Sequence, residues 1–334
     1  MKILFLTRTF YPHIGGVEKH IKEIGLMLIR EGHNVTVLTT KYERYLSSYE
    51  SLKAIKIIRF FQPEIKYLGL LYTWFWILKN RDLFKESDII HIHDVFIWYL
   101  PLKILLPRKK VFVTFHGRWG KYPIPWQDII QKRIGAKLSD GVICIGKYIA
   151  KNYRIKADII TFGATNLSRV KYKKDKKLVV YVGRLDKDIA LDTLFEFIKK
   201  LKGYRIVFCG DGKLAYKARV YGDVRGFVDP KPFYKKAKYC LASGYLTVME
   251  ALASKCLVFV TYDNPLQKDY YELTPFRKFI VYSKDSNELY RKFSYYQRNI
   301  DSGREIIAGG YNWVRKQNWR EMVDNYYKLW GLKR

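Results

Sequence analysis

The sequence predicts two doubly wound α/β domains joined by a short basic linker. Short apolar runs of strand length alternate with helical stretches, and this series restarts once after residue 177. The length of 334 residues also suits two domains of ordinary size. Because 49% of the residues are hydrophobic, two buried cores can form and intrinsic disorder of most of the chain is excluded.

The first domain is expected over residues 1–168. Val17, Ile21, Ile24 and Leu28 mark the apolar face of a helix between the first two strands, which gives a parallel βαβ unit. The expected strands, all rich in β-branched or aromatic residues, span 3–7, 35–39, 55–60, 89–93, 111–115, 142–145 and 159–162.

The basic stretch 169–177 is interpreted as the interdomain linker, and a second domain is expected over 178–303. Its expected strands span 179–182, 206–209, 239–242, 257–261 and 279–282. From about residue 304 to the end, Trp319, Val323, Tyr326 and Trp330 recur at helical spacing. This closing helical segment has to dock on one of the domains.

Residues 67–78 carry no charge and are followed by Lys79 and Arg81. The stretch is shorter than the roughly 18 residues that a membrane span requires. Two interpretations stay open, a helix packed on the protein body and a helix that contacts a membrane surface.

The chain has 62 Lys and Arg against 31 Asp and Glu, a formal charge of +31, which predicts an anionic partner. Nucleic acid, an anionic membrane and a phosphate-bearing substrate all fit that charge. The four cysteines are widely spaced within apolar runs, as expected for free buried thiols in a reducing cytosol. The N-terminal apolar run is too short for a signal peptide, so a cytoplasmic location is expected.

A ligand site is expected at the carboxyl ends of the strands. Gly15 and Gly16 follow the first strand where a helix begins, and amides at a helix N-terminus can approach a phosphate closely. A tight turn from strand to helix would explain the same glycine pair.

Together these residues resemble the retaining, nucleotide-sugar-dependent family 4 glycosyltransferases of GT-B fold, over nearly the whole chain. The N-terminal landmarks are Gly15-Gly16-Val17-Glu18, Asp88-Ile89-Ile90-His91-Ile92-His93-Asp94, Thr114-Phe115-His116-Gly117 and Ser139-Asp140-Gly141-Val142-Ile143. The C-terminal landmarks are Val182-Gly183-Arg184-Leu185, Gly210-Asp211-Gly212, Gly226-Phe227-Val228 and Glu250-Ala251-Leu252-Ala253. The closing segment also looks like the family's last helix, which crosses back to the first domain.

The resemblance implies two domains facing across a cleft, with a nucleotide sugar such as a UDP- or GDP-sugar bound by the second domain and the acceptor by the first. It implies that Gly15 and Gly16 offer amides to the diphosphate, that Arg184 beside Gly183 pairs with its oxygens, and that His116 contacts the donor sugar. Glu250, in a helix that begins near Gly244, would bind the ribose. Neither a cofactor nor a metal is expected. The implied acceptor is a lipid-linked or envelope glycan.

Simpler structural readings exist for three of these residues. Arg184 could be a surface residue, although a guanidinium suits bidentate phosphate pairing. His116 ends an apolar strand, where a histidine is often only a satisfied core residue. Glu250 lies within an apolar helix, where burial without partners is costly, so it is expected to face a site.

The sequence departs from the family pattern at several positions. Ile189 and Ala190 replace the usual Lys-Gly pair after Gly183-Arg184-Leu185, and Lys187 could substitute for that lysine. Ala242 stands where the family has the first of two glutamates, and Phe162-Gly163 replaces the hinge Asn-Gly. A degenerate homologue that binds a nucleotide sugar without turnover is therefore the alternative.

Two rival metal sites are weaker. Asp186 and Asp188 form an Asp-x-Asp pattern, but two tandem α/β series do not suit the single-domain fold in which that pattern binds a metal. His91 and His93 with Asp94 and His116 have metal-ligand chemistry but lack further ligands at usable spacing. Nucleic acid is not expected, because no recognition module is visible. The charge, taken with residues 67–78, instead indicates a peripheral position on the inner face of an anionic membrane.

Overall fold

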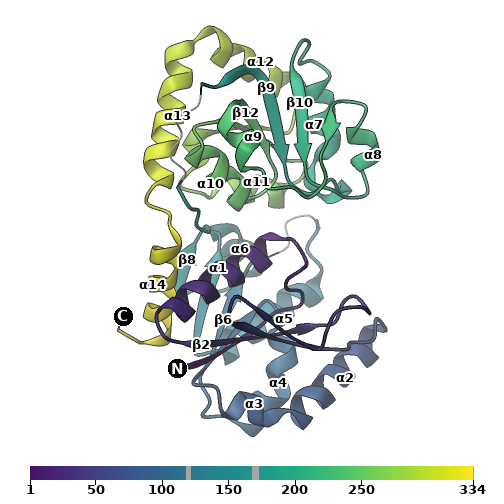
Figure 1. The fold of residues 1–334 in the computed structure, drawn as a ribbon, viewed down its shortest axis with the longest axis vertical. Helices are drawn as coiled ribbons and strands as arrows, with labels where there is room; N and C mark the ends of the chain where they lie inside the picture. The colour runs from purple at the N-terminus through teal and green to yellow at the C-terminus, as the bar shows by residue number, and fades with distance from the viewer. Residues whose placement is uncertain (118–121, 168–172, 334) are drawn as a thin grey trace. The chain divides into compact units, whose positions relative to one another are not determined.

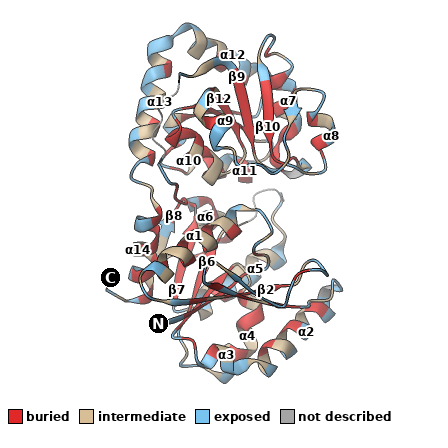
Figure 2. Cartoon of the chain, in the orientation of Figure 1, coloured by how far each residue is buried: buried red, intermediate tan, exposed pale blue. Residues whose placement is uncertain are grey.

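The computed structural model describes residues 1–117, 122–167 and 173–333, which form two α/β units (Figure 1). The first unit comprises residues 1–117, 123–161 and 319–333 of this part, and the second comprises residue 122, 162–167 and 173–318. Each unit has its own sheet, and the strands in the middle of each sheet are buried (Figure 2). The predicted α/β fold class is confirmed.

The first unit contains an eight-stranded sheet of order β3-β4-β2-β1-β5-β6-β7-β8. Its strands are β1 (Lys2–Leu6), β2 (Asn34–Thr40), β3 (Tyr49–Leu52), β4 (Ile55–Phe60), β5 (Ile89–His93), β6 (Val111–Phe115), β7 (Gly141–Ile145) and β8 (Ile159–Thr161). Every pairing is parallel except that of β3 with β4. The chain winds outward from β1 in both directions, so the topological switch point lies between β1 and β5.

The helices of the first unit connect these strands and cover both faces of the sheet. They are α1 (Gly16–Arg30), α2 (Lys66–Lys79), α3 (Arg81–Lys85), α4 (Phe96–Leu105), α5 (Trp126–Leu138), α6 (Lys147–Tyr153) and α14 (Trp319–Trp330). The last of them, α14, packs on α1, β7 and β8. The end of the chain therefore returns to the unit in which it began.

The second unit contains a six-stranded, fully parallel sheet of order β11-β10-β9-β12-β13-β14. Its strands are β9 (Asp175–Val182), β10 (Arg205–Cys209), β11 (Asp223–Val224), β12 (Ala237–Ala242), β13 (Leu257–Thr261) and β14 (Ile280–Ser283). Here the switch point lies between β9 and β12. Tyr181, Phe208, Tyr239 and Phe259 are core residues contributed by its central strands.

The helical segments of the second unit are mostly short. They are η1 (Lys187–Ile189), α7 (Leu191–Ile198), α8 (Ala215–Ala218), α9 (Lys231–Lys236), α10 (Tyr245–Ala253), α11 (Pro265–Glu272), η2 (Arg277–Phe279), α12 (Ser286–Arg298) and α13 (Ile300–Val314). Gly309 and Gly310 of α13 lie close to Phe279 and Leu252, where side chains would not fit.

The closing segment differs from the prediction that residues 304–334 dock together on the first domain. It is interrupted after Val314, and only α14 belongs to the first unit. The interruption has a local cause, because the carbonyl of Gln317 accepts a hydrogen bond from the Thr165 amide (2.9 Å) instead of continuing a helix. Helix α13 packs on α10 in the second unit.

The region around the predicted linker also differs from expectation. The first unit ends at Thr161, before the predicted boundary at 168, and β9 already begins at Asp175. Residues 168–172 lie outside the described residues. Lys174, assigned to the linker, is a structural residue whose ammonium donates to the carbonyls of Tyr234 (2.7 Å), Ala237 (2.9 Å) and Ser254 (2.6 Å).

The four cysteines are buried and free. Burial raises the pKa of the Cys144 thiol to about 12, so this thiol stays protonated and unreactive. Among the described residues, no helix combines the length and the apolar character needed to cross a membrane.

Candidate active site

The N-terminus of α1 follows β1, next to the switch point of the first unit. Gly15 caps the helix in an extended conformation, and a Cβ on it would lie 2.2 Å from Glu18 Oε2. That carboxylate is fixed in place, because Thr9 Oγ1 (2.6 Å) and His13 Nδ1 (2.7 Å) both contact its Oε1. Gly16 is exposed as the first helical residue, so its amide can reach an anion.

The pair of Glu18 and His13 decides the charge at this helix end. The hydrogen bond to Glu18 raises the pKa of His13 against the opposing effect of burial. Burial alone would raise the pKa of Glu18, but the hydrogen bonds from His13 and Thr9 outweigh it and the pKa is lowered. The two groups therefore form an ion pair whose charges cancel, and the carboxylate does not repel an anion from the helix dipole.

His116 follows β6, two strands from β1, and its backbone and ring are both held. Its amide donates to both carboxylate oxygens of Asp94 (3.2 Å each), and its carbonyl accepts from the Tyr148 hydroxyl (3.0 Å). The ring lies edge-on to His20 of α1, with centroids 4.9 Å apart. The structure thus brings His116 against His20 in the second turn of α1.

Asp94 is the residue that ties this region to α5. Its carboxylate forms a very short ion pair with Lys132. Burial would raise the pKa of Asp94, but Lys132 and His116 overcome that effect and the pKa is lowered. Asp94 therefore stays ionised and fixes the backbone of His116.

The tautomer of His116 follows from its contact with His93, where Nε2 of His116 lies 3.0 Å from Nδ1 of His93. Burial lowers the pKa of His116 to about 4 and that of His93 well below its usual value, so both rings are neutral at neutral pH. Among the described residues, no group bonds to the buried Nε2 of His93. A proton there would be an unsatisfied buried N–H, which costs more than an unfilled lone pair. His93 therefore donates from Nδ1, and His116 carries its proton on Nδ1 as a hydrogen-bond donor.

A buried hydrogen-bond chain connects α14 to the same strands. Trp330 Nε1 donates to His91 Nδ1 (3.0 Å), and His91 Nε2 lies 2.7 Å from Thr114 Oγ1. Thr114 Oγ1 is 3.1 Å from the Tyr326 hydroxyl, which is 2.8 Å from His20 Nε2. Because an indole N–H can only donate, His91 accepts at Nδ1 and, as a neutral ring, donates from Nε2 to Thr114 Oγ1.

In the second unit, Gly183 and Arg184 follow β9 at the switch point. Gly183 has a φ of +152°, and a Cβ on it would lie 1.8 Å from Ser243 Oγ, so only glycine fits. The Arg184 side chain is about half exposed (53%), and its Nη1 donates to Asp186 Oδ2 at 3.1 Å. A guanidinium that is about half exposed is therefore held at the carboxyl end of the central strand.

Helix α10 begins at the carboxyl end of β12, the neighbour of β9. Gly244 caps it in an extended conformation, with its amide donating to Thr247 Oγ1 at 3.0 Å. Glu250 is half-buried in the second turn. The contact between Gly183 and Ser243 joins the two strand ends, so Arg184 and the start of α10 belong to one region.

The structure shows where the residues that depart from the family pattern lie. Ile189 is in the core of the second unit, 4% exposed, and Ala242 is the buried last residue of β12. Lys187 is an exposed residue at the start of η1. Ile189 and Ala242 do not supply the ammonium and the carboxylate that the family pattern has at these two positions. An apolar core residue stands in place of the lysine.

The rival metal readings find little support in the geometry. Both ring nitrogens of His91 are engaged in the chain from Trp330, and Asp186 bonds Arg184 and the Lys213 amide (3.1 Å). In the described part of the chain, no three His, Cys, Asp or Glu side chains lie close enough to share a metal ion.

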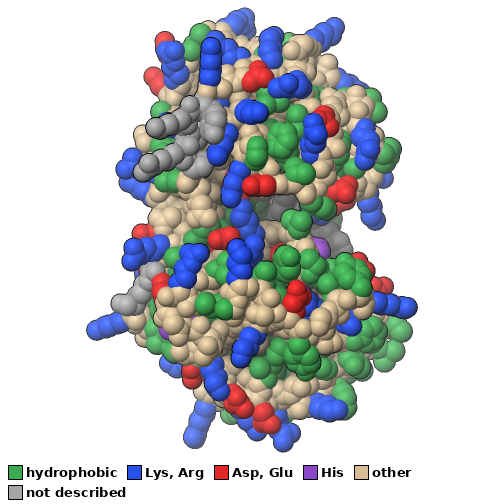
Figure 3. All heavy atoms as spheres, in the orientation of Figure 1, with side chains coloured by type: hydrophobic (Ala, Val, Ile, Leu, Met, Phe, Trp, Pro, Cys, Tyr) green, Lys and Arg blue, Asp and Glu red, His purple; other side chains and the backbone are tan. Residues whose placement is uncertain are grey.

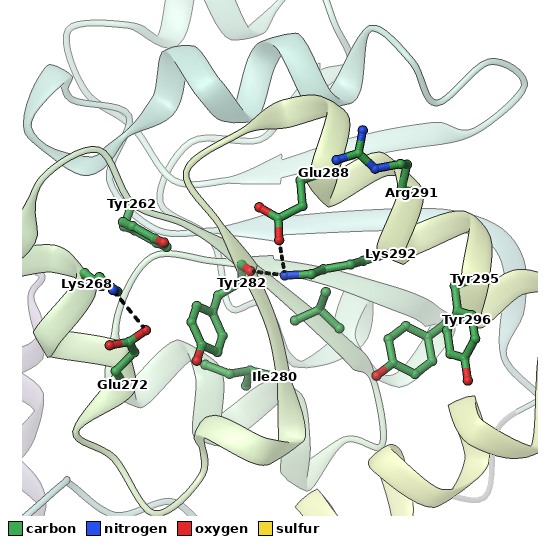
Figure 4. A pocket seen from close by; sticks show the side chains of 11 residues that line it. Tyr262, Lys268, Glu272, Ile280, Tyr282, Glu288, Arg291, Lys292, Tyr295 and Tyr296 are labelled. Carbon is green, nitrogen blue, oxygen red and sulfur yellow. Dashed lines mark hydrogen bonds and ion pairs between the residues drawn. The ribbon is translucent and has the colours of Figure 1, made fainter.

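A shallow pocket of about 630 Å³ lies elsewhere in the second unit, beside the edge strand β14 (Figure 4). Four of the charged residues on its wall form two ion pairs, Lys268 with Glu272 (3.6 Å) and Lys292 with Glu288 (2.7 Å), and Arg291 lines it as well. It contains none of the predicted site residues, so we do not assign the active site to it.

Sequence reasoning missed His20 and Lys132. His20 could have been found as a polar residue on the apolar face of α1, between Val17 and Ile24. Lys132 gives no such signal, because the sequence around it is rich in surface cations.

Residues 14–159 match a family model described as Glycosyltransferase Family 4. The match covers under half of the chain, and over this range the chain is similar to glycosyltransferase family 4. The matched range contains the start of α1 and His116 with its strand β6, and it begins after β1.

The solved structures similar to this chain extend the likeness to both units. A sucrose-phosphate synthase from Thermosynechococcus elongatus has a TM-score of 0.78 at 16% identity and covers 98% of each chain. Anabaena Alr3699/HepE, solved in complex with UDP and glucose, has a TM-score of 0.72 at 13% identity with the same coverage. These similarities show the GT-B fold.

Curated proteins similar to this chain include the phosphatidylinositol N-acetylglucosaminyltransferase GPI3 subunits of two yeasts. The Saccharomyces cerevisiae protein is 26% identical over 63% of this chain, and the Schizosaccharomyces pombe protein 23% identical over 61%. The aligned regions make up 53% and 49% of those two proteins, so the chain spans about half the length of the curated relatives it matches.

Proposed function

We propose that this glycosyltransferase transfers a sugar from a nucleotide-diphosphate donor to a lipid-linked glycan acceptor, with retention at the anomeric centre and without a metal. The observation that carries the proposal is the Arg184 guanidinium, held by Asp186 at a strand end where Gly183 lets backbone approach closely. Such a place suits a diphosphate.

The proposed chemistry needs charge stabilisation on the departing diphosphate while the anomeric carbon becomes oxocarbenium-like. Arg184 supplies the cation, and amides at the start of α1, at Gly15 and Gly16, supply further donors. His116 is neutral and donates from Nδ1, so it can bond a hydroxyl of the donor sugar without adding a second positive charge beside the reaction centre. Glu250 accepts from the ribose hydroxyls, and Lys187 assists at the diphosphate.

Support for the donor and the acceptor comes from the similar proteins. One similar structure holds UDP and glucose, and the curated relatives act on phosphatidylinositol, a lipid, with N-acetylglucosamine as the sugar. We therefore propose a UDP- or GDP-sugar as donor and a lipid-linked or envelope glycan as acceptor. An acceptor of that kind places the enzyme on the cytoplasmic face of a membrane as a peripheral protein.

The test is a donor panel read by mass spectrometry, with UDP- and GDP-sugars first. Wild-type protein is expected to consume one donor, and Arg184→Ala to lower the rate about a hundredfold or more. Arg205→Ala is the matched control, because Arg205 is an exposed, ion-paired arginine at the opposite end of β10 from the site. Equal losses in the two variants would contradict the role of Arg184.

The stereochemical and metal parts of the proposal have separate readouts. The product anomer, read by NMR, should match that of the donor, and activity should survive a chelator. An inverted product would refute retention, and dependence on Mg²⁺ or Mn²⁺ would refute the metal-free mechanism.

The second candidate function is binding of a nucleotide sugar without turnover. It is favoured by Ile189, which is buried in the core where the family has a lysine, and by Ala242, which lacks the first glutamate. Calorimetric binding of a UDP- or GDP-sugar with no donor consumed in the presence of candidate acceptors would establish it over the transferase.

A further inference from the structure

Helix α2 of the first unit exposes a continuous apolar face. Leu68, Leu71 and Phe75 are 55%, 55% and 65% exposed and lie three and four residues apart, so they point the same way. Tyr67 (68%) and Tyr72 (38%) widen this stripe. In Figure 3, hydrophobic side chains gather at the lower right, over the region where Figure 1 draws α2.

The segment just before the helix extends the same face. Ile65 is 63% exposed and Phe61 is 57% exposed, and the Phe61 ring lies edge-on to Tyr72 with centroids 6.0 Å apart. We call the set Phe61, Ile65, Tyr67, Leu68, Leu71, Tyr72 and Phe75 the α2 face. Single exposed apolar residues are ordinary, but a contiguous patch of large ones marks an interaction site.

The opposite side of α2 fixes the helix to the protein. Thr73 and Ile77 are fully buried, and Trp74 Nε1 donates to the carbonyl of Ile97 in α4 at 2.8 Å. Trp76 stacks on Phe60 of β4, with ring centroids 4.9 Å apart. The α2 face is therefore not the surface that holds the helix in the fold.

Charge around the α2 face favours an anionic surface as the partner. Residues 67–78 contain no charged side chain, and the helix ends on Lys79, followed by Arg81, both exposed. The next basic segments lie together, because Lys109 Nζ donates to the carbonyl of Lys85 at 2.8 Å. The stretch 61–86 also holds three acidic residues: Glu64 is exposed, Asp82 pairs with Lys85 (3.1 Å) and Glu86 pairs with Lys2 (3.2 Å). Because the chain as a whole carries +31, an apolar stripe followed by Lys79 and Arg81 still matches the acyl chains and phosphates of an anionic bilayer.

The length of the helix selects how it meets the bilayer. Helix α2 has 14 residues, fewer than the roughly 20 needed to cross, and one side is occupied by protein. It must lie in the plane of the interface.

We propose that the α2 face inserts into the acyl boundary of an anionic membrane and docks the first unit on it. This inference rests on the proposed function only in that a lipid-linked acceptor explains why the enzyme would be there. Docking in this way brings the first unit, to which we assign acceptor binding, against the lipid layer that contains the acceptor.

The test is co-sedimentation of the full chain with vesicles, using an equal mixture of phosphatidylcholine and phosphatidylglycerol. Wild-type protein is expected to sediment at low salt, with weaker binding to phosphatidylcholine alone. The variant L68E/L71E should bind about tenfold more weakly or worse, since it removes buried methylenes and adds charge repulsion. The control Y216E/V220E changes two apolar residues of the second unit that are even more exposed (72% and 78%), and it should bind as wild type.

The substituted side chains are exposed, so unchanged circular dichroism is expected for both variants. Wild-type binding by L68E/L71E, or no sedimentation of wild type, would overturn the inference. It is overturned too if light scattering shows a wild-type oligomer that the variant loses while vesicle binding is unchanged, because the face is then a protein interface.

Donor consumption measured without vesicles separates this inference from the proposed function. If L68E/L71E consumes donor like wild type but loses vesicle binding, both proposals are supported. If no protein consumes any donor, the transferase proposal fails while the vesicle result still decides the docking surface.

Discussion

Acidification should destabilise the first unit selectively. All six histidines of the chain belong to this unit, and the second unit has none among its residues. Burial lowers the pKa of His20, His91 and His93 well below the usual 6.5 and that of His116 to about 4. A group with a lowered pKa in the folded state binds its proton first in the unfolded state, so stability falls as pH drops below 6.5.

The magnitude follows from linkage. When the pH falls from 6.5 to about 5.5, each such histidine lowers the unfolding free energy of the first unit by RT ln(11/2), about 1 kcal/mol. The four histidines together lower it by about 4 kcal/mol. His13 has a raised pKa and acts in the opposite sense, although it is partly exposed and screened by solvent. The carboxylates of Glu18 and Asp94 have lowered pKa values and stay ionised in this window.

The assay is hydrogen exchange read by mass spectrometry at the two pH values, corrected for the intrinsic rate. Peptides from β5 and β6 should lose about a thousandfold in protection, while peptides from β9 and β12 change little and serve as an internal control. His91→Gln removes one ionisable ring, so the pH-dependent loss should shrink by about 1 kcal/mol whatever the variant's stability at neutral pH. Equal losses in both units, or none in the first, would refute the reasoning.

Three further predictions concern single contacts. Lys174→Met should lower the unfolding free energy of the second unit in urea by about 2 kcal/mol, because three carbonyls lose their donor, whereas Lys176→Met should be neutral. Gly203→Ala should lower the unfolding free energy by about 1 kcal/mol, and Gly183→Ala should lower it by more. Both glycines have a positive φ, but of the two only Gly183 would place its new Cβ against another atom, Ser243 Oγ; similar losses would argue against the clash. His93→Leu should lower kcat about tenfold or more with little change in KM for the donor, and His93→Asn should restore most of it, since the amide can donate in place of Nδ1; equal kcat values in the two variants would remove the positioning role.

The sheets could be predicted from the sequence because parallel strands buried on both faces read as continuous apolar runs. The bounds of β5 and β6 match the predicted 89–93 and 111–115, and every residue in them is buried. Edge strand β3 was missed because its sequence, Tyr-Glu-Ser-Leu, is polar and largely exposed. The fold places the glycines and His116 at strand ends near the switch point, as the sequence predicts.

The contacts that tune these residues could not be predicted, because they join distant segments. The pairing of Lys132 with Asp94 depends on how α5 packs beside β6, and the donor direction in the chain from Trp330 depends on α14 returning to the first unit. Neither a local pattern nor the composition contains that information.

Ile189 and Ala190 stand where the family has a Lys-Gly pair, and only the backbone turn of that pair is retained. Ala190, at the place of the family's glycine, has a φ of +52°, a conformation that glycine adopts without strain. The turn is therefore retained, while the neighbouring side chain has become part of the core, 4% exposed, and Thr261 Oγ1 donates to the Ala190 carbonyl at 3.1 Å.

Restoring the lysine should consequently damage the protein instead of improving it. Ile189→Lys would bury an ammonium among apolar side chains, with an expected loss of about 3 kcal/mol in the unfolding free energy of the second unit. Ile189→Met, similar in volume, should cost less than about 1.5 kcal/mol. If Ile189→Lys speeds donor consumption without loss of stability in urea, the side chain at this position reaches the diphosphate. If it destabilises as expected, position 189 is a core position, and the proposed diphosphate contacts of the second unit fall to Arg184 and Lys187.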